Sequence, residues 1–275
     1  MSILATPVAG GDNRRVPPRV SSPEFVGRAA ELARLEAALE RAERGSAAAA
    51  FVAGESGVGK TRLLRELERR AVERGARVLR GDCVAFGAGE LAYAPLAAAL
   101  RRLARELDPA VLDELLGGAR DELARLAPEL SPTPLGGARA QDVSAGEAHA
   151  QARLFGLLRA LLDRLAAESP VLFAIEDLHW ADRSTLEFVS SLLGGLHDER
   201  LLLVCTYRSD ELHRRHPLRP FLAEAERREL VERIELAPFS PVELAAQVAG
   251  ILGSAAAPEL VARLYARCEG NAFFV

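Results

Sequence analysis

The strongest constraint on this chain is the segment 54–61, which reads GESGVGKT and contains the only lysine of the sequence. It has the pattern G-x-x-x-x-G-K-[ST] of a phosphate-binding loop, whose glycines let backbone N–H groups converge on phosphate oxygens. The other 34 of the 35 Lys and Arg residues are arginine, but a compact ammonium fits under the β- and γ-phosphates where a planar guanidinium is too wide. The segment therefore predicts a loop that binds ATP or GTP.

The residues on either side of this loop supply the structural context that the motif requires. Residues 47–53 form a short apolar run, and residues 60–74 have apolar side chains at helical spacing. The N-terminus of such a helix adds its positive end to the phosphate site, and the Thr61 hydroxyl is a ligand for Mg²⁺. The residues predicted to contact nucleotide here are Gly54, Glu55, Ser56, Gly57, Val58, Gly59, Lys60, Thr61 and Arg62.

A second motif ends at Glu176 and Asp177, which follow the apolar residues 171–175. A carboxylate at the carboxyl end of a buried parallel strand faces the crevice where ligands bind, as in the Walker B pattern. We assign Glu176 to Mg²⁺, together with Thr61, and Asp177 to orienting the attacking water. Strand alternation leaves an exchange of the two roles open. The alternative interpretation, solvated acids at an ordinary strand end, is disfavoured by the phosphate loop earlier in the chain.

A third candidate is Arg208, which follows the apolar run 201–207. A polar residue at the end of the strand beside the acidic motif can sense the γ-phosphate, and Thr206 competes with Arg208 for this role. A solvated arginine is an equally good reading of Arg208. Trp180, the only tryptophan, is interpreted as a core or hinge anchor, and Asp182 as the acid that caps the next helix.

Strand and helix patterns alternate along most of the chain, which predicts an α/β fold with a parallel sheet and helices on both faces. Together with the phosphate loop, this indicates a P-loop NTPase of the ASCE or AAA-like type. After Pro238 the patterns are purely helical. The expected strands are 47–53, 77–80, 171–177, 201–207 and 231–236; the expected helices are 29–44, 60–74, 93–127 with a break at 117–118, 147–167, 184–196, 220–228, 241–252 and 258–268.

These patterns divide the chain into three parts. Residues 1–22, with their Gly and Pro pairs, are expected to be a disordered leader. Residues 23–236 are expected to form the ATPase core, in which the Pro-, Gly- and Ser-rich stretch 128–146 is a mobile insertion. Residues 237–275 begin a helical subdomain. The sequence stops inside an apolar stretch, so we expect a fragment of something longer.

Composition excludes several classes of protein. The net charge of −4, with arginines interleaved among acids, gives no electrostatic footprint for nucleic acid. The three cysteines lie far apart, which argues for reduced thiols rather than a metal site or a disulfide framework. No apolar run is long enough to span a bilayer, and the first residues lack a cationic region followed by an apolar one, so we expect no signal peptide in this sequence. We therefore expect a cytoplasmic protein that contacts neither membrane nor, through this segment, DNA.

The motifs together resemble a known family. Residues 25–32 (FVGRAAEL), the loop 54–61 and residues 175–182 (IEDLHWAD) are similar to the AAA-type ATPase domain of STAND signal-transduction proteins, and more narrowly to the N-terminal module of large ATP-binding LuxR-type regulators. Residues 206–208 resemble that family's sensor-1 strand end. Residues 238–240 resemble the start of its helical subdomain, and residues 270–274 (GNAFF) its G-N-P-F-F segment.

The resemblance implies further roles. Val26, Gly27 and Arg28 would lie near the adenine and ribose, and ATP or ADP with Mg²⁺ would switch the module between a closed state and an open, self-associating state. The sequence departs from the family pattern at three positions. Ala29 stands where the family commonly has an acid. Ala272 replaces the usual proline, which weakens the case for a nucleotide contact at that end, and Glu176 replaces the usual aspartate, so hydrolysis is expected to be slow.

The favoured function is a regulatory ATPase switch of a signal-transduction or transcriptional regulator. The alternatives are a stand-alone AAA-type ATPase or a P-loop phosphotransferase. A phosphotransferase needs a lid with several arginines, and this sequence could provide one with Arg214, Arg215, Arg219, Arg227 and Arg228. Direct DNA binding is a further alternative, and the charge balance argues against it; any DNA-reading domain would lie beyond Val275.

Overall fold

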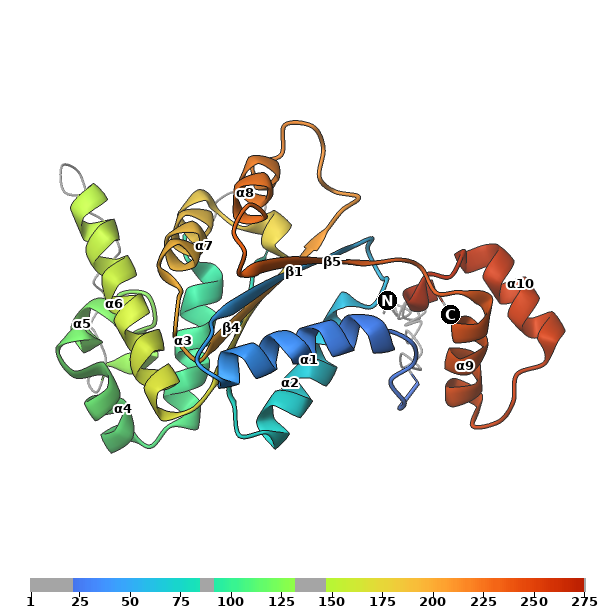
Figure 1. Cartoon of the computed structure of the whole chain (residues 1–275), viewed down its shortest axis with the longest axis horizontal. Coiled ribbons are helices and arrows are strands. Elements are labelled where there is room, and N and C mark those ends of the chain that lie inside the picture. Colours follow the sequence, from blue (N-terminus) through green and yellow to red (C-terminus); the bar gives the residue numbers. More distant parts are fainter. Residues whose placement is uncertain (1–21, 85–91, 132–146, 275) are drawn as a thin grey trace, which may run out of the picture.

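The computed structural model describes residues 22–84, 92–131 and 147–274. Its centre is a five-stranded sheet in the order β2-β3-β4-β1-β5, in which every neighbouring pair is parallel. Helices lie on both faces of the sheet (Figure 1). The predicted α/β fold with a parallel sheet is therefore confirmed. The strands are β1 (Ala48–Gly54), β2 (Arg77–Asp82), β3 (Val171–Glu176), β4 (Leu201–Arg208) and β5 (Val231–Leu236).

Ten α-helices and four short 3₁₀ helices are found in the described residues. The α-helices are α1 (Ala29–Glu43), α2 (Lys60–Glu73), α3 (Ala94–Glu106), α4 (Pro109–Leu116), α5 (Arg120–Leu123), α6 (Glu147–Glu168), α7 (Arg183–Gly195), α8 (Leu218–Ala225), α9 (Pro241–Leu252) and α10 (Pro258–Cys268). The 3₁₀ helices are η1 (Gly117–Ala119), η2 (Pro128–Leu130), η3 (Leu178–Trp180) and η4 (Ala272–Phe274).

The three central strands, β1, β3 and β4, are apolar up to their carboxyl ends because both of their faces are covered. Alternate residues of β1, β3 and β4 belong to two separate cores: Phe51, Phe173 and Leu203 pack with α3, α6 and α7 on one face. Val52 and Leu172 pack with α1 and α2 on the other. This is the arrangement expected for parallel strands that read as continuous apolar runs. β1 pairs with β4 on one side and with β5 on the other, and this pairing fixes where the loop after β1 emerges.

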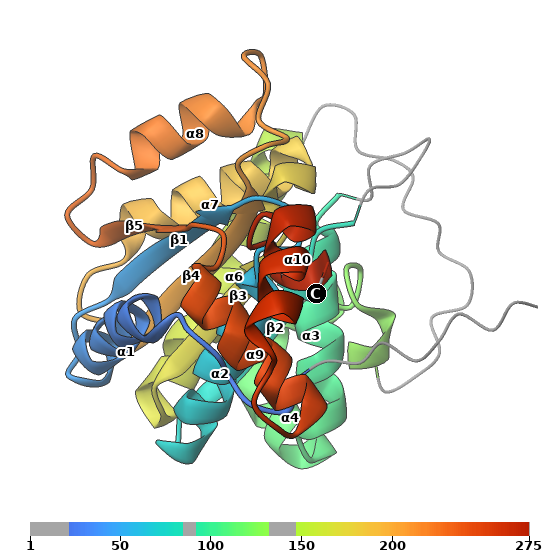
Figure 2. The ribbon, with the colours of Figure 1, turned by 90° about the vertical axis from the view of Figure 1, so that its right-hand side faces the viewer.

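The carboxyl ends of all five strands meet at one edge of the sheet because the strands are parallel. Helices α9 and α10 lie beyond this edge, at the right of Figure 1, and Figure 2 looks onto them with the sheet behind. The Ser240 side chain and Glu243 form a capping box that starts α9. As expected, the Asp182 side chain caps α7 by accepting the N–H of Thr185 at 3.0 Å.

The structure differs from the sequence expectations mainly at helix boundaries. The expected helix 93–127 is broken at Leu107, which has extended backbone, because Asp108 caps a new helix that has Pro109 in its first turn. Helix α8 ends at Ala225, so Arg227 and Arg228 lie outside it. Within the expected insertion 128–146, Pro128–Leu130 forms η2 with Leu130 buried.

Some expectations fall partly or wholly outside the described residues. The rest of the insertion, 132–146, and residues 1–21 of the expected leader lie outside the described residues.

The three cysteines are described, and each is a buried free thiol. In the parts of the chain that the structure covers, no helix combines the length and apolar character that crossing a bilayer requires.

The packing of α2 on the sheet gives a stability test. Leu67 is 0% exposed, whereas Val72 on the same helix is 60% exposed. We expect Leu67→Ala to lower the free energy of unfolding by about 2–5 kcal/mol, because it leaves a cavity in a closed core. Val72→Ala should change it by less than about 0.5 kcal/mol. Urea denaturation of the two variants checks this, and equal losses would contradict the assigned packing.

Candidate functional site

A cavity of about 470 Å³ opens at the carboxyl edge of the sheet, between the loop after β1, the segment before α1 and the C-terminal helices. Among the residues predicted to form the site, those that line it are Val26, Arg28, Gly57, Val58, Gly59, Lys60, Thr61, Arg62, Asp177 and Arg208. Gly27, Gly54, Glu55, Ser56 and Glu176 do not line it. The wall also includes Phe25, Arg65, Phe239, Gln247, Ala272 and Phe273, which the sequence interpretation did not assign.

The loop between β1 and α2 has a backbone that only glycine accommodates easily. Gly57 has φ +79°, and a Cβ there would lie 2.6 Å from Asn271 Oδ1. Gly59 has φ +110° and precedes the first residue of α2. The first N–H groups of α2 have no acceptor within the helix, so they are available to an anion at its N-terminus.

Lys60 is buried, and its ammonium is held against the loop itself. Nζ donates to the carbonyl of Gly54 at 2.7 Å and to that of Glu55 at 2.8 Å. Burial lowers the pKa of Lys60, and the nearby Asp177 carboxylate opposes this shift. An ammonium has three N–H donors, so one remains for a group in the cavity.

The two predicted metal ligands, Thr61 and Glu176, are bonded to each other, with Glu176 behind the cavity wall. It is 3% exposed, and its Oε2 accepts the hydroxyl proton of Thr61 at 2.5 Å. Its other oxygen, Oε1, is paired with the guanidinium of Arg80 on β2. Burial raises the pKa of Glu176, while the Thr61 hydrogen bond and Arg80 lower it.

Asp177 has a different position from its neighbour. It lines the cavity together with Lys60 and Arg208. Its backbone has φ 55°, and its N–H donates to the buried Thr206 Oγ1 at 3.1 Å. Burial raises the pKa of the Asp177 carboxyl, and the charges of Arg208 and Lys60 lower it. Of the two competitors, Thr206 thus supports the backbone after β3, whereas Arg208 faces the cavity.

Arg208 is fixed from two sides. Its guanidinium lies 4.8 Å above the Trp180 ring, and it is paired with Glu211. Trp180 packs against the core beneath, in agreement with its interpretation as an anchor. Arg208 is therefore held at the cavity wall rather than free in solvent.

His179 was not assigned a role from the sequence, although it is one of the few buried polar residues. Its Nδ1 accepts the N–H of Arg208 at 3.4 Å, and its Nε2 lies 3.3 Å from Glu211 Oε2. Burial lowers the pKa of His179 to about 4. The neutral ring therefore joins the end of β4 to the turn after β3.

Both ends of the described chain contact the loop. The guanidinium of Arg28 donates to the carbonyl of Val58 at 3.1 Å and to that of Ala237 at 2.5 Å, and it lies 4.8 Å from the Phe239 ring centroid. Asn271 donates from Nδ2 to the carbonyl of Ser56 at 2.8 Å. Although residue 272 is alanine rather than proline, this C-terminal segment thus forms part of the cavity wall.

Comparison with known proteins identifies the family. Residues 24–205 match the AAA ATPase domain family. The chain belongs to this family. An uncharacterized protein of Rhizobium meliloti (strain 1021) is 27% identical over 203 residues, which cover 64% of this chain and 18% of that protein. The AAA ATPase domain described here thus spans less than a fifth of the length of that curated relative.

Solved structures that are similar to this AAA ATPase domain include a STAND protein with a tetratricopeptide repeat sensor from Pyrococcus horikoshii (18% identity, TM-score 0.44, covering 94% of this chain and 30% of that one). The ORC1 protein of Aeropyrum pernix in complex with DNA is 20% identical, with a TM-score of 0.48 and coverages of 94% and 59%. AMPPCP-bound DnaA from Aquifex aeolicus is 14% identical, with a TM-score of 0.45 and coverages of 90% and 60%.

The buried His179 ring should make stability depend on pH. Its pKa of about 4 lies below the unfolded value of about 6.5, so the unfolded chain binds more protons between these values and stability falls as the pH is lowered through this window. Between pH 7 and pH 5 we expect this residue to account for a loss of about 1–2 kcal/mol. Urea denaturation at both pH values should show a smaller loss in His179→Asn than in the wild type.

The control is His149→Asn, at an exposed position on α6. It should leave the pH dependence of the unfolding free energy as in the wild type. If His179→Asn also leaves it unchanged, then the neutral, buried state assigned to His179 is wrong.

Proposed function

We propose that this domain binds ATP or ADP with Mg²⁺ in the cavity, hydrolyses ATP slowly, and uses the bound state as a switch in a signal-transduction or transcriptional regulator. One observation carries the proposal: the single lysine, buried in a phosphate-type loop, faces the same cavity as Asp177 and Arg208. Membership of the AAA ATPase domain family supports it.

The residues of the cavity fit a nucleotide. The first turn of α2 offers N–H donors to phosphate oxygens, and Lys60 adds the matching charge. Arg28 is buried and lines the cavity, and its Nε has no hydrogen-bond partner within the described residues. Val26 and Phe25 lie in the same wall, so this side would hold the base and ribose. Gly27 packs behind it against Glu243.

The residues also fit Mg²⁺. Thr61 and Glu176 would hold it, because hydroxyl and carboxylate oxygens are the hard ligands that this ion takes. The described residues contain no cluster of three or more His, Cys, Asp or Glu side chains that could form a metal site. Mg²⁺ in nucleotide sites is completed by waters and phosphate oxygens, so one carboxylate is sufficient. When bound, the ion would neutralise charge on the phosphates.

The remaining polar residues have complementary tasks in hydrolysis. Asp177 would accept a proton from, or orient, the attacking water at the open side of the cavity. Arg208, held by Trp180 and Glu211, would stabilise charge that develops on the terminal phosphate. Glu176 does not line the cavity but is bonded to Thr61, which does, and this supports the assignment from the sequence of Glu176 to the metal and Asp177 to the water.

A switch requires the cavity to be linked to another part of the chain. Asn271 from the C-terminal segment bonds to the loop, and Arg28 bonds to the loop and to Ala237 at the start of the helical part. Movement of the loop on nucleotide binding would therefore change the contacts of α9 and α10. We propose that this controls self-association and that the regulator is of the LuxR type suggested by the sequence motifs, with no DNA bound by this segment itself.

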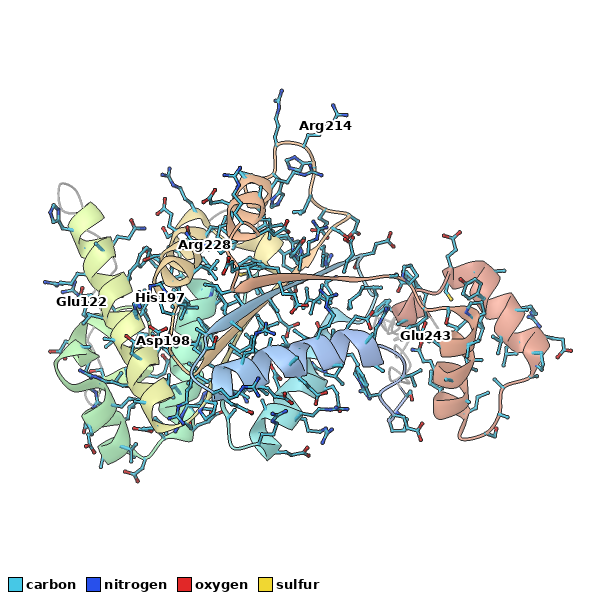
Figure 3. The ribbon with its side chains drawn as sticks, in the orientation of Figure 1. Glu122, His197, Asp198, Arg214, Arg228 and Glu243 are labelled. Carbon is cyan, nitrogen blue, oxygen red and sulfur yellow. The ribbon has the colours of Figure 1, made fainter. Side chains whose placement is uncertain are left out.

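The phosphotransferase alternative is less well supported. None of the five arginines of 211–228 is among the described residues that line the cavity. Arg214 stands at the tip of its loop and points away from the body of the domain (Figure 3). Release of phosphate from ATP without an added acceptor favours the ATPase, whereas a strict requirement for a phosphate acceptor would favour a kinase.

We expect Lys60→Ala to weaken binding of fluorescent ATP with Mg²⁺ by more than about 100-fold, because a buried charge-assisted contact worth about 3 kcal/mol is lost. Arg69→Ala, which removes an exposed cation from the same helix, is the control and should leave binding unchanged. Wild-type protein that is folded but does not bind at millimolar nucleotide would refute the proposed function.

Asp177→Asn should leave ATP affinity within about 3-fold of the wild type and lower the rate of phosphate release by at least about 100-fold, because it removes the acceptor for the water proton. Asparagine tolerates the positive φ of this position, so the backbone should not change. The matched control is Asp198→Asn, at an exposed site before β4 (Figure 3). Normal turnover in Asp177→Asn would move the catalytic role to Glu176.

A further inference from the structure

A single cation lies directly behind the proposed metal ligands, and the reaction outlined above gives it no role. Arg80 projects from β2 and contacts three carboxylates that come from three elements. It pairs with Glu176 on β3, and it lies 3.4 Å from Glu68 on α2 and 3.4 Å from Asp82 on its own strand. Its side chain is only 17% exposed.

The direction of the hydrogen bond between Thr61 and Glu176 determines which groups of Thr61 are left to bind a metal ion. A hydroxyl has one proton and two lone pairs. Thr61 gives its proton to Glu176 Oε2, so its lone pairs remain for a cation. If Glu176 turned away or lost its charge, Thr61 would have to place its proton elsewhere. The orientation of the Glu176 carboxylate therefore decides whether Thr61 is ready to bind a metal ion.

Arg80 fixes that orientation. With Oε2 engaged by Thr61, the second oxygen of a buried carboxylate needs a partner, and Arg80 supplies it. Glu68 and Asp82 in turn hold the guanidinium in place. The parallel register puts Asp82 beside Glu176, so β2 and β3 bring these groups together at the same edge of the sheet.

We propose that Arg80 is a positioning residue of the metal site: by pairing with Glu176 Oε1, it holds the carboxylate so that Thr61 presents its lone pairs to Mg²⁺. The inference rests on the proposed function. A positioning role for Arg80 differs from two other roles that an arginine could have beside Glu176. A purely structural ion pair would affect folding but not metal binding, and a competitor for Glu176 would weaken the metal site in the wild type.

The test measures Mn²⁺, as a probe for Mg²⁺, binding to the protein with ADP, by electron paramagnetic resonance of the free ion. In Arg80→Met, the dissociation constant for Mn²⁺ should rise about 10–100-fold, as is typical when a partner behind a metal ligand is lost. The affinity for ADP measured in EDTA should not change. Arg80→Lys keeps the positive charge but lacks the planar guanidinium. Its dissociation constant for Mn²⁺ should lie between those of the wild type and Arg80→Met.

The matched control is Arg77→Met, which removes an arginine at the other end of β2 that pairs only with the exposed Glu168 among the described carboxylates; its Mn²⁺ affinity should equal that of the wild type. Unchanged Mn²⁺ affinity in folded Arg80→Met would reduce Arg80 to a structural role, and tighter binding would make it a competitor; either overturns the proposal. If Arg80→Met does not fold, Arg80→Gln and Arg80→Lys decide by the same measurement.

The two proposals can fail separately. Wild-type protein that binds neither ADP nor Mn²⁺ would refute the proposed function and this inference together. Wild-type protein that binds both, with Arg80 variants that respond like Arg77→Met, would refute only the inference.

Discussion

Burial of the Lys60 ammonium at the carboxyl end of β1 is the interaction on which the rest of this structure depends. A buried cation is costly unless polar groups surround it, and here the loop turns back so that the carbonyls of Gly54 and Glu55 point at Nζ. That turn requires glycines, and it needs a strand end that lies inside the sheet rather than at its border. The position of β1 between β4 and β5 meets the second requirement. The parallel strands then bring the ends of β3 and β4, with Asp177 and Arg208, to the same place.

Several of the charges at and behind the cavity wall lie beside charges of opposite sign. Asp177 lies near Lys60 and Arg208, Arg208 is paired with Glu211, and Glu176 is paired with Arg80. A polyphosphate would enter on the side of Lys60 and Arg208, and it would have to share these cations with Asp177. A divalent cation placed near Thr61 offsets the added negative charge. The wall of the cavity carries more cations (Arg28, Lys60, Arg62, Arg65 and Arg208) than carboxylates (Glu24 and Asp177), so it suits an anion, and a metal ion that arrived with the phosphate would lower the repulsion near Asp177.

The sequence was sufficient for the parts of this site that depend on local pattern. The loop, all five strands and the two C-terminal helices were predicted from spacing and apolar runs, since these patterns are read within a few residues. It assigned Glu176 to the metal and Asp177 to the water but left an exchange of the two roles open, because adjacent side chains at a strand end differ only in the direction they take once the strand is paired. Arg80 and Asn271 were also missed. Each meets its partner only through non-local packing, and Arg80 is one arginine among many with no local pattern to distinguish it.

The two ends of the described chain converge on the loop in a way that local pattern also does not reveal. The carbonyl of Ser56 accepts from Asn271, and the carbonyl of Val58 accepts from Arg28. These peptide groups flank Gly57, whose backbone has no room for a side chain against Asn271. If phosphate draws the loop N–H groups inward, the same peptide planes must rotate, and the carbonyls on their other side must tilt with them because a peptide unit is rigid. Both hydrogen bonds would then lengthen or break together. Any response of the helical part to the contents of the cavity would then pass through these two hydrogen bonds of the loop.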